Sequence, residues 1–242
     1  MTPPVEPRRV GMITPPGWFS YCGDELTRFS RGQISVMNTV MRFDPPFGYT
    51  LPEVSASPDE LRRCVDSLGN ADSELIVQVG TPFSTVHGWQ QGCALEQELS
   101  ERTGVRVEMM GLSVVRKLQE LGVTRVAATT VYYDAPWTDH YAKFLASADF
   151  DVAYVGSFEQ QGIAESIGSV AACTQHQSVA TIERSVQRVI ELAPAAEAIV
   201  IAGIPCQLLD ASAGLSQSNE RHVVTYTAMY ERCARILALP VA

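Results

Sequence analysis

The chain has 242 residues, a formal net charge of −9 at neutral pH and a hydrophobic fraction of 46%. This length allows one large domain or two small ones, and the hydrophobic fraction is sufficient for a buried core. The acidic balance disfavours nucleic acid and anionic membrane surfaces, which attract basic patches, whereas one local pocket could still bind an anionic substrate. No apolar run reaches the roughly 18 residues of a membrane span, and residues 1–9 contain no apolar signal core. We therefore expect a soluble cytoplasmic protein that could form a homo-oligomer.

The cysteines and histidines do not have the spacing of a metal site. The chain has no Cys-x-x-Cys pair, and none of its four histidines forms a metal-binding pair at helical spacing. A disulfide framework is not expected either, because the cysteines are widely scattered. We therefore predict no metal site. The six cysteines are Cys22, Cys64, Cys93, Cys173, Cys206 and Cys233.

Apolar, β-branched runs alternate with amphipathic segments along the chain. The predicted strands cover residues 10–14, 34–41, 75–79, 105–110, 125–131, 151–155, 198–202 and 223–226. The predicted helices cover residues 57–70, 92–103, 112–121, 137–148, 178–192 and 228–237. Ser57 would be the N-cap of the first of these helices, with Pro58 at the first helical position. The alternation predicts an α/β fold with mainly parallel sheets and helices on both faces.

The chain contains a duplicated pattern. Residues 77–82 read Val-Gln-Val-Gly-Thr-Pro, and residues 200–205 read Val-Ile-Ala-Gly-Ile-Pro. We therefore predict two similar Rossmann-like halves, related by a pseudo-twofold axis, with an active-site cleft between them. The predicted parts are an N-terminal tail (1–9), a first half (10–112 and 224–242) and a second half (113–223).

The two strand ends should form the walls of one site, because ligands of open α/β sheets bind at the carboxyl ends of the strands. The first wall would contain Gly80, Thr81 and Pro82, and the second Gly203 and Ile204. Glycines at strand ends are also common without any function, but the repeated Gly-x-Pro favours a functional role. The Thr81 hydroxyl could alternatively bond its own turn.

Four short motifs carry a family resemblance: residues 11–16 (Gly-Met-Ile-Thr-Pro-Pro), Gly80-Thr81 after a buried strand, residues 125–132 ending in Tyr132, and residues 209–211 (Leu-Asp-Ala). In this order and spacing, the sequence resembles the aspartate/glutamate racemase superfamily, within it the branch of arylmalonate decarboxylases and maleate cis–trans isomerases. The resemblance spans most of the chain. It implies cofactor-free chemistry on a small carboxylic acid, through an enolate-type intermediate held in an oxyanion nest.

The resemblance also implies where the reacting groups should lie. Two cysteines normally face the substrate, and the decarboxylases keep only the second, as a proton donor. In this chain the first cysteine position is Gly80 and the second is Gly203, while Cys206 lies in the same loop. Racemisation by two thiols and covalent isomerisation through the first thiol are therefore excluded at the usual positions. Thr81 matches a hydroxyl that holds the substrate carboxylate, and Tyr132 matches the family tyrosine that donates from its phenol.

Other residues are weaker candidates for the same site. Pro82 replaces a serine of the decarboxylases, which removes one donor, and Pro15 and Pro16 would contact the substrate. Cys206 could be the acid or nucleophile, or a small buried residue. His87 could be a general acid/base or a structural residue. Aromatic residues could form an apolar wall or cover the core. These are Trp18, Phe19 and Tyr21.

The preferred function is an arylmalonate decarboxylase-like activity on a small mono- or dicarboxylic acid, with or without an aryl substituent. One alternative is another reaction of the same superfamily, either maleate-type isomerisation or thiol-independent hydrolase or lyase chemistry. A second alternative is a relative that binds carboxylates without catalysis, which the loss of both family cysteines would permit. A nucleotide-binding protein is disfavoured because no Gly-rich phosphate loop follows any strand.

Overall fold

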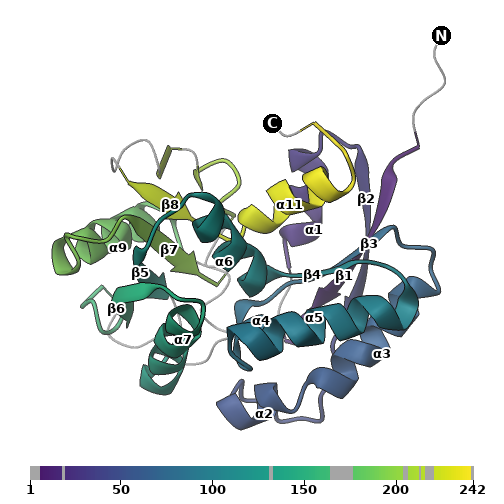
Figure 1. The fold of residues 1–242 in the computed structure, drawn as a ribbon, viewed down its shortest axis with the longest axis horizontal. Coiled ribbons are helices and arrows are strands. Elements are labelled where there is room, and N and C mark those ends of the chain that lie inside the picture. The colour runs from purple at the N-terminus through teal and green to yellow at the C-terminus, as the bar shows by residue number, and fades with distance from the viewer. Residues whose placement is uncertain are drawn as a thin grey trace.

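The computed structural model describes residues 6–17, 20–130, 133–163, 177–203, 207–212, 214–215 and 221–240. Within these residues the chain forms two parallel sheets of four strands each, with helices packed around both (Figure 1). Every pair of neighbouring strands is parallel. The predicted α/β fold with two similar halves is confirmed.

The two sheets have the same strand order. The first has the order β2-β1-β3-β4 and the second β6-β5-β7-β8, so the second repeats the first four strands later in the chain. The strands of the first sheet are β1 (Arg8–Thr14), β2 (Ile34–Val40), β3 (Leu75–Gln78) and β4 (Val107–Met109). Those of the second are β5 (Arg125–Thr130), β6 (Asp151–Ser157), β7 (Ala198–Ala202) and β8 (His222–Val224).

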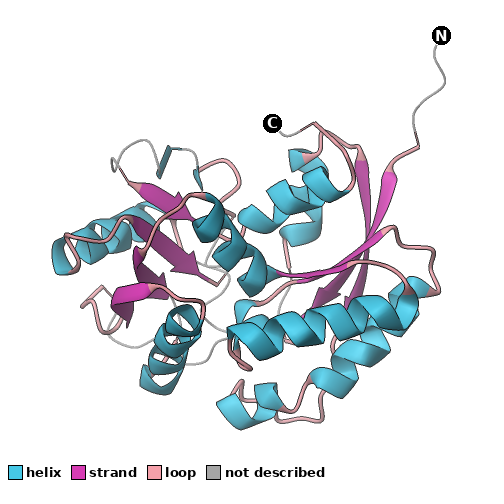
Figure 2. Ribbon diagram, viewed as in Figure 1, coloured by secondary structure: helices cyan, strands magenta, loops and turns pink. Residues whose placement is uncertain are grey.

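Helices flank each sheet, as Figure 2 shows in cyan against the magenta strands. The helices are α1 (Cys22–Phe29), α2 (Leu51–Ser55), α3 (Pro58–Gly69), α4 (Thr81–Thr85), α5 (Trp89–Thr103), α6 (Met110–Glu120), α7 (Ala135–Ser147), α9 (Val179–Leu192) and α11 (Ala228–Ile236). Helices α6 and α11 pack against each other between the two sheets (Figure 1). None of the helices in the described part of the chain has both the length and the apolar character needed to cross a membrane.

The central strands explain why the sequence pattern predicts the fold well. Every residue of β3 and of β7 is buried. A parallel strand covered on both faces needs apolar residues at successive positions rather than at alternate ones, and these two runs have that pattern. The carboxyl ends of β3 and β7 are therefore fixed by the core, which positions Gly80 and Gly203 just beyond them.

A buried ion-pair cluster attaches α11 to the first sheet. Glu108 on β4 has no exposed side-chain surface and accepts hydrogen bonds from Arg232 on α11 at 2.8 and 2.9 Å. Arg106 and Arg116 also pair with this carboxylate, at 2.6 and 3.2 Å. Burial alone would raise the pKa of Glu108, but the bonds and charges of the arginines outweigh burial and lower it.

The structure corrects the prediction for the start of α3. The helix begins at Pro58, but Ser57 has φ −77° and ψ −11° and its side chain makes no capping hydrogen bond. The Ser57 hydroxyl is buried without a partner among the described residues. The backbone of Ser57 is already helical, so its side chain cannot reach the amides of the first turn as an extended N-cap residue does.

Candidate active site

Gly80 and Gly203 have similar and unusual backbone conformations. Their φ angles are +97° and +88°, in the region that side chains disfavour. A Cβ atom at position 80 would lie 2.5 Å from Cγ of Pro15, which is well inside van der Waals contact. The strand end at Gly80 therefore has space only for a glycine in this conformation, and Pro15 packs directly against it.

Thr81 connects the two predicted walls. Its Oγ1 accepts a hydrogen bond from the backbone N–H of Gly203 at 3.3 Å, and the residue is only 3% exposed. The Thr81 carbonyl accepts from the hydroxyls of Ser84 and Thr85 at 3.0 and 2.9 Å, which fixes the first turn of α4. The Thr81 hydroxyl proton has no acceptor among the described residues, so it can be donated to a ligand oxygen. The structure thus brings Gly80, Thr81 and Gly203 together.

Gln78 supports the first wall from within the core. It is the last residue of β3, has no exposed surface, and its Nε2 donates to the carbonyl of Gly80 at 3.0 Å and to that of Val79. Pro82, which follows Thr81, is buried in the first turn of α4. Sequence reasoning missed Gln78, although a polar residue inside an otherwise apolar strand is a visible signal.

An aromatic cluster lies beside this wall. Phe43 and Phe47 stack with ring centroids 4.3 Å apart, and Phe83 of α4 lies 6.0 Å from Phe43. Tyr49 packs edge-on against Phe47 at 4.7 Å, and its hydroxyl donates to the carbonyl of Pro16. Phe43 and Phe47 are partly exposed. The cluster is therefore an apolar surface next to Pro15 and Pro16 that a ligand can reach.

The loop that carries Tyr49 also contacts the second half. The Trp137 indole N–H, on α7, donates to the Tyr49 carbonyl at 2.8 Å. The sequence leaves two roles open for Trp18, Phe19 and Tyr21, an apolar wall of the site or a cover for the core. Trp18 and Phe19 lie outside the described residues, and Tyr21 is partly exposed just before α1. The sequence signal for the observed cluster is three aromatic residues close together after β2, namely Phe43, Phe47 and Tyr49, and a fourth, Phe83, shortly after the end of β3.

His87 lies in a shallow groove along α3 and α5, with Pro58, Arg62 and Glu98. Burial and the nearby His140 lower the pKa of His87, and its Nε2 has no partner among the described residues. The groove has a volume of about 280 Å³, and its lining does not include Thr81. No described contact joins His87 to the glycine walls, and its acid/base role stays a prediction.

Three of the predicted site residues lie outside the described residues, namely Tyr132, Ile204 and Cys206. Their roles therefore stay predictions. The neighbouring Tyr133 is 2% exposed and packs against Trp137, with ring centroids 5.6 Å apart. Tyr133 thus packs in the core.

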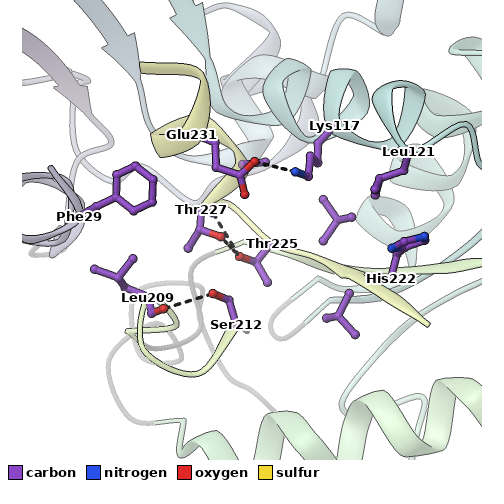
Figure 3. Close-up of a pocket in the computed structure, with 12 residues that line it drawn as sticks. Phe29, Lys117, Leu121, Leu209, Ser212, His222, Thr225, Thr227 and Glu231 are labelled. Carbon is purple, nitrogen blue, oxygen red and sulfur yellow. Dashed lines mark hydrogen bonds and ion pairs between the residues drawn. The ribbon is translucent and has the colours of Figure 1, made fainter. Parts of the chain in front are cut away.

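A separate cavity of about 480 Å³ opens beside β8, between α6 and α11 (Figure 3). Lys117 and Glu231 form an ion pair at 2.6 Å on one side of it, and the hydroxyls of Thr225 and Thr227 bond each other at 2.8 Å. Its lining contains none of the site residues predicted from the sequence. The exposed His222 also lines this cavity.

The fold is that of known two-lobed α/β enzymes. The crystal structure of arylmalonate decarboxylase superposes with a TM-score of 0.77 at 22% identity, covering 94% of this chain and 92% of that one. Maleate isomerase Iso from Pseudomonas putida S16 gives 0.82 at 16% identity, with 97% and 94% covered. Nocardia farcinica maleate cis-trans isomerase, bound to TRIS, gives 0.79 at 19% identity, with 96% and 93% covered. These similarities show that the chain shares the fold of arylmalonate decarboxylase and of the maleate isomerases.

The sequence comparison is more specific than the structural one. The model of the family "Arylmalonate decarboxylase" matches residues 53–235, which is most of the chain and includes both glycine strand ends. A comparison with curated protein sequences found no match. This chain belongs to the arylmalonate decarboxylase family.

Proposed function

We propose that the protein is a cofactor-independent decarboxylase of small, aryl-substituted malonates. The observation that carries this proposal is the contact between Thr81 Oγ1 and the Gly203 amide, at 3.3 Å, beside a Gly80 that cannot accept a side chain without displacing Pro15. Such a site offers donors for a carboxylate and has no thiol at the first position. The family match supports a decarboxylase or an isomerase.

The walls would act on the negative charge that develops as the substrate loses carbon dioxide. The bond between the α-carbon and one carboxylate breaks, and its electron pair moves to the remaining carboxyl group, which becomes an enediolate. The Thr81 hydroxyl would donate to an oxygen of this group, and the predicted donor Tyr132 would assist. Preorganised donors at developing charge are worth about 3–4 kcal/mol each in comparable sites.

Protonation of the α-carbon completes the reaction and gives the monocarboxylic acid. Cys206, which follows Gly203 in the sequence, is the first candidate for this proton donor, and His87 or water are the alternatives. A thiol suits this step because it can transfer a proton to carbon and recover it from water.

The aromatic cluster supports an aryl substituent on the substrate. Phe43, Phe47 and Phe83 lie within 6.4 Å of one another, measured between ring centroids, and Phe43 and Phe47 are partly exposed. Offset or edge-to-face contacts with a substrate ring would add about 0.5–1.5 kcal/mol beyond the burial of its area. Discrimination between aryl and alkyl malonates should therefore depend on this cluster.

Glycine at both family cysteine positions also favours a second candidate, a relative that binds a carboxylate without turnover. The same Thr81 contact would serve a binder, since it needs no titrating group. Covalent maleate isomerisation is less favoured because it requires a thiol at position 80. Hydrolase or lyase chemistry without a thiol remains the third candidate.

The test is carbon dioxide release from phenylmalonate by the purified protein. We expect turnover by the wild type and its collapse in Cys206→Ala, whereas Cys93→Ala, a control at a partly buried thiol on α5, should retain activity. Turnover that persists in Cys206→Ala would place catalysis on the oxyanion nest and another donor. Phenylmalonate binding in calorimetry without turnover would favour the binder. The absence of both binding and turnover would refute the decarboxylase proposal.

A further inference from the structure

A carboxylate outside the candidate site is buried without a cationic partner. Glu25, on α1, is 1% exposed, and no arginine or lysine among the described residues forms a salt bridge with it. Arg28, one turn further along the helix, pairs instead with Asp210, at 2.7 Å. Burying an unpaired charge is costly unless hydrogen bonds compensate for it, so this position needs an explanation.

Three donors compensate Glu25, and all three come from distant parts of the sequence. The hydroxyls of Tyr226 and Tyr230 donate to its Oε2 at 2.8 and 2.9 Å, and the Leu209 amide donates to its Oε1 at 3.2 Å. Burial and neighbouring groups raise the pKa of both phenols, which keeps them protonated as donors. The Tyr226 hydroxyl in turn accepts from the Leu208 amide at 2.8 Å.

These bonds hold the main chain just beyond the second wall. Leu208 and Leu209 are the residues whose amides Tyr226 and Glu25 bind, and they follow Gly203 and Cys206 closely in the sequence. Gly203 itself is held by Thr81. The backbone amides of Gly203, Leu208 and Leu209 are therefore each bound by a side chain from another element. Leu209 also lines the cavity beside β8 (Figure 3).

We propose that Glu25 is a positioning residue: through Tyr226 and the Leu209 amide, it fixes the main chain at Leu208 and Leu209 and thereby supports the second wall at Gly203. The catalytic consequence rests on the proposed function, whereas the structural one does not. A carboxyl group retained in the core for geometry rather than for stability is consistent with the small net contribution of buried polar pairs to stability.

Tyr230 provides a matched control, because it donates to the same carboxylate oxygen but makes no described contact with Leu208 or Leu209. The variants are Glu25→Leu, Tyr226→Phe and Tyr230→Phe, and Glu25→Gln is the conservative rescue because its amide oxygen can still accept from Leu209. The readouts are hydrogen exchange at the Leu208 and Leu209 amides, thermal stability, and kcat and KM on phenylmalonate.

We expect Glu25→Leu to accelerate exchange at the Leu209 amide, and Tyr226→Phe at the Leu208 amide, by about tenfold or more, because each variant removes the acceptor of that amide. Tyr230→Phe should leave this exchange near wild type even where its melting temperature falls, and Glu25→Gln should lie between. In an active enzyme kcat should fall in the same order, with KM changing less. Should Glu25→Leu fail to fold, Tyr226→Phe still decides the question.

Two results would overturn the proposal: equal acceleration of exchange in Tyr226→Phe and Tyr230→Phe, or no acceleration in either Tyr226→Phe or Glu25→Leu. Exchange that only follows the global stability of each variant would indicate a purely structural role. An inactive wild type would refute the proposed function alone, and the exchange pattern would then decide the positioning role by itself.

Discussion

Replacing Gly80 by alanine should lower the free energy of unfolding more than most other additions of a single methyl group in this chain. Two terms contribute. The φ angle of +97° disfavours any side chain, at a cost of about 1–3 kcal/mol. The new Cβ would lie 2.5 Å from Pro15 Cγ, and relief of such overpacking costs about 1–3 kcal/mol more. A total near 4 kcal/mol corresponds to a fall in Tm of about 8–16 °C in a chain of this size.

Gly104 separates the two terms. It also has a positive φ, +70°, but a Cβ there would meet nothing within 4 Å. Gly104→Ala should therefore cost only the conformational term, about 1 kcal/mol. Urea and thermal unfolding would measure both variants, and Pro15→Ala would complete a double-mutant cycle with Gly80→Ala. We expect a coupling of about 1–3 kcal/mol, because alanine at position 15 lacks the clashing Cγ. Equal costs at positions 80 and 104, or no coupling, would refute the close approach at the first wall.

Three further substitutions test the site and its supports. Thr81→Val should lower kcat on phenylmalonate by about 100-fold, because it removes a donor. The control Thr85→Val loses a hydroxyl that is bound to a backbone carbonyl in the same short helix, and it should keep most of the activity. Equal losses of kcat in the two variants would contradict the role of Thr81. Trp137→Phe should lower the free energy of unfolding by about 1–2 kcal/mol, measured by urea titration, because the Tyr49 carbonyl loses its donor. The folded-state pKa of Glu108 is lowered, so its contribution to stability is present above the unfolded pKa of about 4.3 and is lost as the pH falls. The difference in urea midpoint between wild type and Glu108→Gln should therefore be large at pH 7 and shrink below about pH 4, and an unchanged difference would show that Glu108 is not ionised in the fold.

The elements that could be predicted from the sequence are those whose own apolar pattern indicates burial. The apolar runs of β3 and β7 and the glycines beyond them are local features, and the structure joins them through Thr81, as two facing walls require. Helix α2 was missed, because no helix is predicted between residues 42 and 56. Its signal was present, since Thr50 and Glu53 form a capping box, with the Thr50 amide donating to Glu53 at 2.8 Å.

What the sequence could not predict depends on contacts between distant residues. Glu25 looks like an exposed helical acid, and only the fold brings Tyr226 and Tyr230 onto it. The aromatic cluster likewise combines Phe43 and Phe47 of one loop with Phe83 of α4, so the aromatic spacing after Pro16 suggested a different wall. Ser57 failed as a cap because its backbone conformation, not its residue type, decides capping.

The attachment of α11 to β4 has a consequence for how the chain acquires its structure during synthesis. Arg232 is made 124 residues after Glu108, the acid that it neutralises. Until then β4 carries an interior carboxylate that lacks one of its main cations, although the rest of its sheet has been translated. Domains tend to fold as units while the chain emerges, but here the first half should not complete its packing at β4 until α11 has been synthesised. The two halves would then reach their final packing together, as a single cooperative event.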